Sequence, residues 1–167
     1  MACTQTLTGI SRDCLGNNGG IAAVWLANFD NVSSLTEASG AITAITMANS
    51  EKFKKYVFPR NTSSMSSNYA VSSENGTSYV ETDLVMVFTR MDTSKRLEIV
   101  ALAQGNLVAI VEDNNGNKWY LGHDYPVTIN AGSGESGTAR GDRNGYSITL
   151  RDESQQLPFP FTGTIPV

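Results

Sequence analysis

Residues 77–122 read TSYVETDLVMVFTRMDTSKRLEIVALAQGNLVAIVEDNNGNKWYLG and predict a strand, a helix and a hairpin in immediate succession. From Thr77 to Met91, apolar residues alternate with polar ones, which is the period of a strand that covers a core with one face. Asp92 can cap a helix over Thr93 to Gln104, and Gly105 is expected to end that helix in the left-handed conformation. The core-facing residues of the strand are Val80, Thr82, Leu84, Met86 and Phe88.

The segment after this helix predicts a fully buried strand and a tight turn. Within Asn106 to Glu112, all five residues from Leu107 to Val111 are apolar, so neither face of this strand is polar. Asn115 and Gly116 are typical of a hairpin turn that needs positive backbone dihedrals, and Lys118 to Leu121 form the returning strand.

The composition favours a β protein of one domain. The chain has 167 residues, which suits a single domain, and only 17% of them are charged. Short apolar runs are separated by residues that favour turns. We therefore predict one mainly β domain over residues 1–167, an antiparallel β-sandwich or a partly closed barrel with one flanking helix at about 93–104.

Further strands and loops follow from the same patterns. Asn31 to Gly40 is predicted to be a polar loop, and Ala131 to Asn144, which is rich in glycine, an exposed and mobile one. Strands are predicted at Cys3–Ile10, Ile21–Phe29, Ala41–Ala48, Lys52–Phe58, Thr62–Ser73, Val127–Asn130 and Tyr146–Leu150.

Two segments carry more apolar surface than an isolated domain needs. On a helical wheel, Leu97 and Val100 lie on one side while Ile99 and Leu102 lie on another, so a second surface is expected to cover the helix. The C-terminal segment 157–167 is predicted to be an extended arm. Candidate subunit-interface residues are therefore Leu157, Phe159, Phe161, Ile99 and Leu102. A helix tucked into its own domain is the alternative interpretation.

Charge and local pattern exclude several functions. The net charge of −4 disfavours nucleic-acid binding. No apolar run is long enough to cross a bilayer, and the first residues lack the order of a signal peptide, so we expect a protein made in a cytosol with no membrane anchor. Cys3 and Cys14 are then predicted to be buried thiols rather than a disulfide.

The chain offers little catalytic chemistry. His123 next to Asp124 is the one candidate pair, and no serine or cysteine near it has the context of a nucleophile. One histidine and two cysteines cannot complete a zinc site with four ligands. We predict a protein that is not an enzyme and has no cofactor or metal.

The sequence resembles small virion structural proteins of tailed phages that infect Bacteroides-like bacteria, including the crAss-like phages. The residues that carry this resemblance are Asp13-Cys14, Gly19-Gly20-Ile21, Leu26-Ala27-Asn28-Phe29, Met91 to Arg96 with Glu98, Ala101-Leu102-Ala103, Val108, Ile110 to Asp113, and the Asn-Gly turn before Trp119-Tyr120-Leu121-Gly122. Together they extend over most of the chain, and none of them is a catalytic motif.

The resemblance implies a fold like that of tail-tube proteins, in a ring around the channel through which DNA is ejected. The implied partners are copies of the chain in a hexamer or dodecamer, neighbouring tail, portal or adaptor rings, and genomic DNA that passes without sequence-specific contacts. The implied location is the virion tail or neck, assembled in the cytoplasm of the bacterial host. We expect Glu81 and Asp83, on the outer face of the long strand, to face the channel.

A binding module is the alternative from another functional class. A small β-sandwich can recognise carbohydrate through aromatic rings, and Trp25, Trp119 and Tyr120 are the candidates. In such a module these rings would be exposed together beside polar groups.

Overall fold

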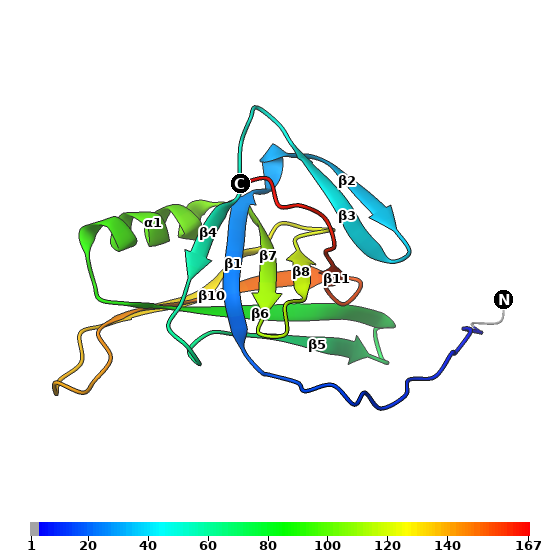
Figure 1. The fold of residues 1–167 in the computed structure, drawn as a ribbon, viewed down its shortest axis with the longest axis horizontal. Helices are drawn as coiled ribbons and strands as arrows, with labels where there is room; N and C mark the ends of the chain where they lie inside the picture. The colour runs from blue at the N-terminus through cyan, green and yellow to red at the C-terminus, as the bar shows by residue number, and fades with distance from the viewer. Residues whose placement is uncertain (1–3) are drawn as a thin grey trace.

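The computed structural model describes residues 4–167 and consists of two antiparallel sheets, one separate hairpin and one α-helix (Figure 1). The five-stranded sheet has the order β11-β8-β7-β1-β4, and the four-stranded sheet has the order β5-β6-β10-β9. The bounds are β1 Ile21–Asn28, β2 Val32–Ala38, β3 Ala41–Met47, β4 Lys54–Val57, β5 Ser64–Ser72, β6 Thr77–Thr89, α1 Thr93–Gln104, β7 Leu107–Asp113, β8 Lys118–Leu121, β9 Thr128–Glu135, β10 Gly145–Ser154 and β11 Phe159–Pro160, with a 3-10 turn at Phe29–Asn31.

This arrangement confirms the predicted fold class. The protein is mainly β, its sheets are antiparallel and one helix flanks them. The sheets are not closed into a barrel, so the sandwich is the correct one of the two predicted forms.

The five-stranded sheet is buried on both faces, because β1 is apolar from Ile21 to Ala27 and β7 is apolar from Leu107 to Val111. Residues of β1 and β7 alternate between two clusters: Val24 contributes to the cluster between the sheets, and Trp25 to the cluster on the opposite face. The second cluster is covered by the β2–β3 hairpin and the C-terminal segment, through Ile42 and Phe161. All residues from Leu107 to Val111 are buried, as predicted for a strand covered on both sides.

The helix begins as predicted but ends differently. The Asp92 carboxylate accepts a hydrogen bond from the Lys95 amide at 2.8 Å. Gly105 has φ −92°, so the expected left-handed ending is wrong. A Cβ atom on Gly105 would lie 3.2 Å from Cδ2 of Leu107, so a close approach rather than backbone conformation explains the glycine. Leu102 is buried in the cluster between the sheets, whereas Leu97 is 58% exposed.

The turn between β7 and β8 has the predicted glycine but not the predicted asparagine conformation. Gly116 has φ +86°, and Asn115 is absent from the positive-φ residues of the described chain. The Asp113 carboxylate instead accepts hydrogen bonds from the amides of Asn115 and Asn117, both at 2.9 Å. One left-handed residue therefore closes this turn.

Replacing Gly116 by valine is expected to destabilise the protein by about 1 kcal/mol or more, because a β-branched residue is strained at positive φ. Chemical denaturation followed by fluorescence measures this change. Gly141→Val is the matched control, since a Cβ atom there meets open space and its φ is not in the left-handed region. Equal effects of the two substitutions would contradict the assignment of the turn.

Three predicted elements differ in the structure. Residues 4–10 form no strand and are exposed, and Cys3 lies outside the described residues. The polar loop predicted at 31–40 contains β2, which pairs with β3. The loop predicted at 131–144 is shorter, because residues 131–135 belong to β9 and pair with β10. Residues 136–144 are exposed at the tip of the hairpin that projects from one end of the molecule (Figure 1).

The C-terminal segment is not an extended arm. Phe159 in β11 pairs with Tyr120 in β8, Phe161 is buried in the second cluster, and the Phe53 amide donates to the Pro166 carbonyl at 2.9 Å. The segment lies along its own sheet because the rings of Phe159 and Phe161 are removed from water there.

Cys14 is exposed and free, which corrects the predicted buried thiol. Among the described residues, no helix combines the length and apolar character that a membrane span requires.

Candidate functional site

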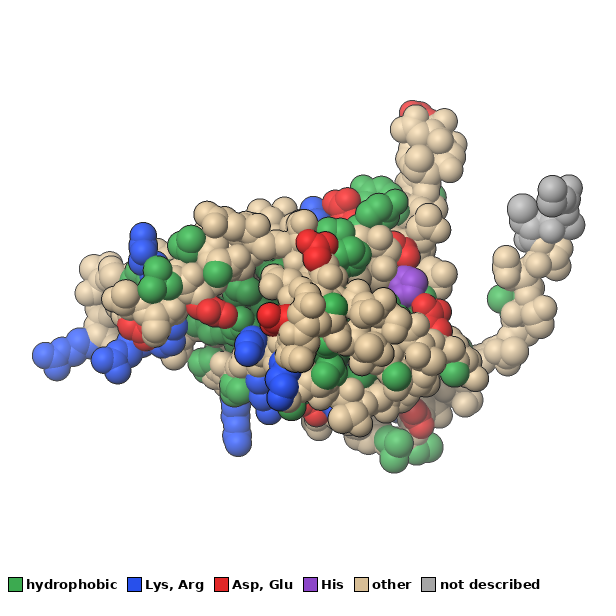
Figure 2. Space-filling model, turned by 90° about the horizontal axis from the view of Figure 1, so that it is seen from above, with side chains coloured by type: hydrophobic (Ala, Val, Ile, Leu, Met, Phe, Trp, Pro, Cys, Tyr) green, Lys and Arg blue, Asp and Glu red, His purple; other side chains and the backbone are tan. Residues whose placement is uncertain are grey.

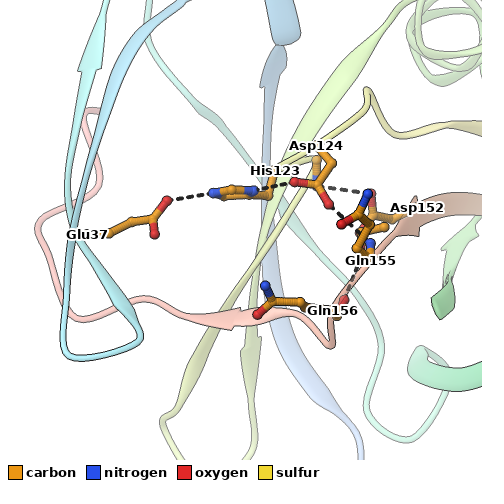
Figure 3. A network of polar contacts seen from close by, with 8 residues as sticks. Glu37, His123, Asp124, Asp152, Gln155 and Gln156 are labelled. Carbon is orange, nitrogen blue, oxygen red and sulfur yellow. Dashed lines mark hydrogen bonds and ion pairs between the residues drawn. The ribbon is translucent and has the colours of Figure 1, made fainter. Parts of the chain in front are cut away.

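His123 lies in a network of polar contacts that joins the β2–β3 hairpin to the end of β8 (Figure 3). Its Nε2 lies 2.6 Å from Oε1 of Glu37, and its Nδ1 lies 2.7 Å from Oδ1 of Asp124. The imidazole also packs against Phe159, with ring centroids 4.5 Å apart. Oδ2 of Asp124 accepts a hydrogen bond from the Gln155 amide at 3.1 Å, which fixes the carboxylate.

This geometry makes the imidazole a link between elements. Both ring nitrogens face carboxylates, so neither is directed at open space. Burial alone would lower the pKa of His123, but the hydrogen bonds to Glu37 and Asp124 outweigh it and raise the pKa. The hydrogen bonds to both carboxylates therefore favour the charged imidazolium, which links Glu37 of β2 to Asp124, the next residue in the chain.

Replacing His123 by glutamine is expected to destabilise the protein more at about pH 6 than at about pH 8.5. Because the folded protein raises the pKa of His123, the stability that its charge contributes is complete below the unfolded pKa of about 6.5 and is lost as the pH rises through the folded value. Thermal unfolding of both proteins across this range measures the difference. Glu74→Gln, an exposed turn residue, is the control, and a difference that grows with pH would contradict the ion pairs.

Asp152 is a buried carboxylate close to this network. It is 2% exposed, and its Oδ1 accepts a hydrogen bond from the Gly122 amide at 3.2 Å. Burial raises the pKa of Asp152 to about 6, although the bond from Gly122 opposes this shift. This carboxylate is therefore partly protonated in weakly acidic solution.

A different surface lies on the outer face of the four-stranded sheet. The alternation of the strands places Glu81 and Asp83 of β6 there, beside Arg151 and Glu153 of β10, and Glu135 of β9. The strand residues of this face carry four carboxylates and one guanidinium, a charge of −3, and Arg143 from the tip of the β9–β10 hairpin pairs with Glu135 at 3.0 Å. Its other residues are mostly small and polar: Ser64, Ser66, Asn68, Ala70, Ser72, Thr77, Tyr79, Val85, Val87, Thr89, Thr128, Ala131, Ser133, Ser147 and Thr149.

The single arginine of this face is held by its neighbours. Nε of Arg151 donates to Oδ1 of Asp83 at 2.8 Å and its Nη2 donates to Oδ2 at 2.9 Å, while Nη1 lies 3.8 Å from Glu81. The hydrogen bonds from Arg151 lower the pKa of Asp83. The guanidinium is therefore already paired with carboxylates, so a phosphate would have to displace them to bind it.

The candidate interface residues do not form one surface. Phe161 and Leu102 are buried within the chain itself, and Phe159 and Ile99 are partly buried against the two clusters. Leu157 is 47% exposed. Burial removes Phe161 and Leu102 from any contact surface, and the exposed part of the helix comes from Leu97 and Val100 instead.

The aromatic candidates for carbohydrate recognition are not exposed together. Trp25 and Tyr120 are buried, and Nε1 of Trp119 donates to the Asp113 carboxylate at 3.3 Å. Tyr79 and Tyr125 are the exposed rings that share one depression, with Glu153 and Gln155 beside them.

Sequence reasoning identified His123 and Asp124 but missed Glu37 and Asp152. Glu37 is 86 residues from His123 and lies in a segment that was predicted to be a loop. Asp152 lies in β10 beyond the predicted strand, where polar residues gave no sign of burial. The alternation of β10 up to Leu150, continued by two residues, was the one sequence feature that places Asp152 on the core-facing side.

Comparison of this chain with protein-family models, with curated proteins and with solved structures finds no match.

Proposed function

We propose that the chain is a structural subunit of a phage tail or neck, which assembles into a ring around a channel that carries DNA. The observation that carries this proposal is the outer face of the four-stranded sheet. Small polar side chains, a charge of −3 and an arginine already paired with carboxylates make a wall that binds phosphates weakly. DNA slides past such a wall, whereas free lysines and arginines would retain it.

The shape of the subunit also supports the proposal. The β9–β10 hairpin projects from one end of the body and the N-terminal segment from the other (Figure 1). Both segments are available to contact neighbours on opposite sides, as a head-to-tail ring requires.

The assembled state of the purified full chain tests this proposal. We expect light scattering after size exclusion to give a multiple of the 17.9 kDa subunit mass, and negative-stain images to show rings with an open centre. A strict monomer at high protein concentration would overturn the proposal.

Replacing Asn68 by lysine is expected to create DNA binding in the assembled ring. This residue lies on the outer face of β5 opposite Glu81, where a lysine makes the charge of the wall less negative by one in every subunit, and its effect should weaken as salt is raised. Fluorescence anisotropy with linear duplex DNA measures the binding, which the unmodified ring should lack. Ser34→Lys in β2 is the matched control outside this face, and equal binding by both variants would contradict the placement of the wall.

A carbohydrate-binding module is the second candidate function. It is favoured by the depression in which Tyr79 and Tyr125 lie beside Glu153 and Gln155, since sugars stack on exposed rings and bond to such polar groups. Tyr125→Ala should then abolish binding on a glycan array, and an array without signal for the unmodified chain would exclude this candidate.

A further inference from the structure

The N-terminal segment has apolar side chains that nothing in its own chain covers. Residues 4–16 are exposed at every position and belong to no strand or helix. Leu7 is 90% exposed, Ile10 104% and Leu15 81%. The segment stands clear of the body in two views (Figures 1 and 2). Yet Thr4-Gln5-Thr6-Leu7-Thr8-Gly9-Ile10 has the β-branched residues that strands prefer.

The edge of β5 is unprotected by the devices that normally block edge pairing. In the described chain β5 pairs only with β6, and its nine residues include no charge, proline or glycine. The other edges of the two larger sheets differ: β4 carries Lys54 and Lys55, β11 contains Pro160, and β9 contains Gly132 and Gly134. In the separate hairpin, β2 carries Glu37, and β3 is bridged through Ile42 to Phe161 of the C-terminal segment. The edge of β5 is therefore the place where an additional strand fits best.

One end of β5 also has an uncovered inner face. Met65, Tyr69 and Val71 share the face that looks toward the other sheet, as their partners in β6 show. Met65 packs against the core, but Tyr69 is 59% exposed and Val71 is 70% exposed. The inner surface of the four-stranded sheet thus continues beyond the part that the core covers.

We propose that residues Thr4 to Gly9 of one copy add as a strand to the β5 edge of a second copy. The alternation of a strand then places Leu7 on the inner face beside Tyr69 and Val71. Thr4, Thr6 and Thr8 fall on the opposite face, where they continue the polar surface formed by Ser64, Ser66 and Asn68. Both faces of the added strand match the faces of the sheet that receives it.

The occupant is a second copy because of how the segment is held. The Asn115 side chain bonds to Asn17 and Asn18, at 2.9 Å and 2.8 Å, and the side-chain Nδ2 of Asn114 donates to the Gly19 carbonyl at 2.6 Å. The 13 residues from this anchor back to Thr4 reach up to about 40 Å when extended. They lead away from the body and leave the outer edge of β5 of the same chain unpaired. This inference deepens the proposed function and rests on it, since donor and acceptor on different faces build a head-to-tail ring.

A mixing experiment tests the pairing. The donor-deficient variant lacks residues 4–15 and keeps the anchor, and the acceptor-deficient variant is Tyr69→Lys with Val71→Lys, both at exposed positions. Light scattering should give assemblies for the full chain, a monomer for each variant alone, and a dimer for their 1:1 mixture, because one intact donor then meets one intact acceptor. Ser34→Lys with Thr36→Lys is the charge-matched control on β2 and should assemble normally.

A labelled peptide of residues 4–16 separates this inference from the ring itself. Fluorescence anisotropy should show the peptide binding to the variant that lacks residues 4–15, with affinity lowered roughly tenfold or more by Leu7→Asn in the peptide or by the two lysines on β5. Thr6→Asn, on the polar face, is the matched control and should bind as the unmodified peptide does. Peptide binding together with full-chain assemblies that lack an open centre in negative stain would support the pairing and overturn the ring, whereas rings that form without residues 4–15 and a peptide that does not bind would overturn the pairing alone.

Discussion

Replacing Phe161 by alanine is expected to lower the free energy of unfolding by about 3 to 4 kcal/mol. The ring is 4% exposed and packs in the second cluster with Ile42, Tyr120 and Val108. Truncation leaves a cavity that the surrounding sheet cannot close, and it detaches the C-terminal segment from β3 and β8. Equilibrium denaturation in urea, with the slope compared between variants, measures this loss.

Leu157→Ala is the control for Phe161. Leu157 belongs to the same C-terminal segment but is 47% exposed, so its truncation should change stability by less than about 1 kcal/mol. If Phe161→Ala had an equally small effect, the C-terminal segment would not be part of the core, and the prediction of an extended arm would hold after all.

Replacing Asp152 by asparagine is expected to stabilise the protein by about 2 to 3 kcal/mol at pH 7 to 8. The folded protein raises the pKa of this carboxyl from 3.8 to about 6, so the native state binds more protons than the unfolded state between these values. The contribution of Asp152 to stability is therefore complete below about 3.8 and is lost as the pH rises through about 6. Asparagine keeps the oxygen that accepts from Gly122 and removes the buried charge.

Denaturation series at several pH values measure the effect of Asp152→Asn. The gain should grow from about pH 4 to about pH 6 and stay constant above that. Asp30→Asn, at an exposed position, is the control and should show no gain of this size. A variant that is less stable than the unmodified protein at pH 8 would mean that the ionised carboxylate is favoured where it lies.

The elements that could be predicted are those whose local signals agree. In β6 the alternation holds from Val80 to Met86, and each core-facing residue in that range is fully buried. The helix starts at Thr93 because Asp92 accepts from the Lys95 amide, an interaction within four residues of the chain. Such elements need no knowledge of distant segments, so their sequence suffices.

The elements that were missed depend on distant partners. Val32 to Ala38 has few apolar residues and becomes a strand because β3 pairs with it and Leu35 packs on the second cluster. The glycine-rich residues 131–135 extend β9 because β10 supplies hydrogen bonds that no local preference would predict. Tertiary pairing overrides weak propensity in both cases.

The candidate site was predictable only in part, for the same reason. Asp124 follows His123 directly, and the alternation of β6 placed Glu81 and Asp83 on one face. Arg151 pairs with Asp83 across 68 residues, and the sequence alone does not show that the guanidinium and the carboxylate would meet. The C-terminal segment was wrongly predicted because its apolar residues could be buried equally well against another subunit or against the sheet of the same chain.

The double burial of β7 has a consequence for how the strands align. A shift of the β7 register by one residue would exchange Val108 and Ala109 between two clusters that are both apolar. The hydrophobic effect therefore discriminates little against the wrong register. The correct offset must come from polar groups at the strand's end. The side chains of Asn114 and Asn115 bond to residues just before β1, and these hydrogen bonds can set the register between β7 and β1.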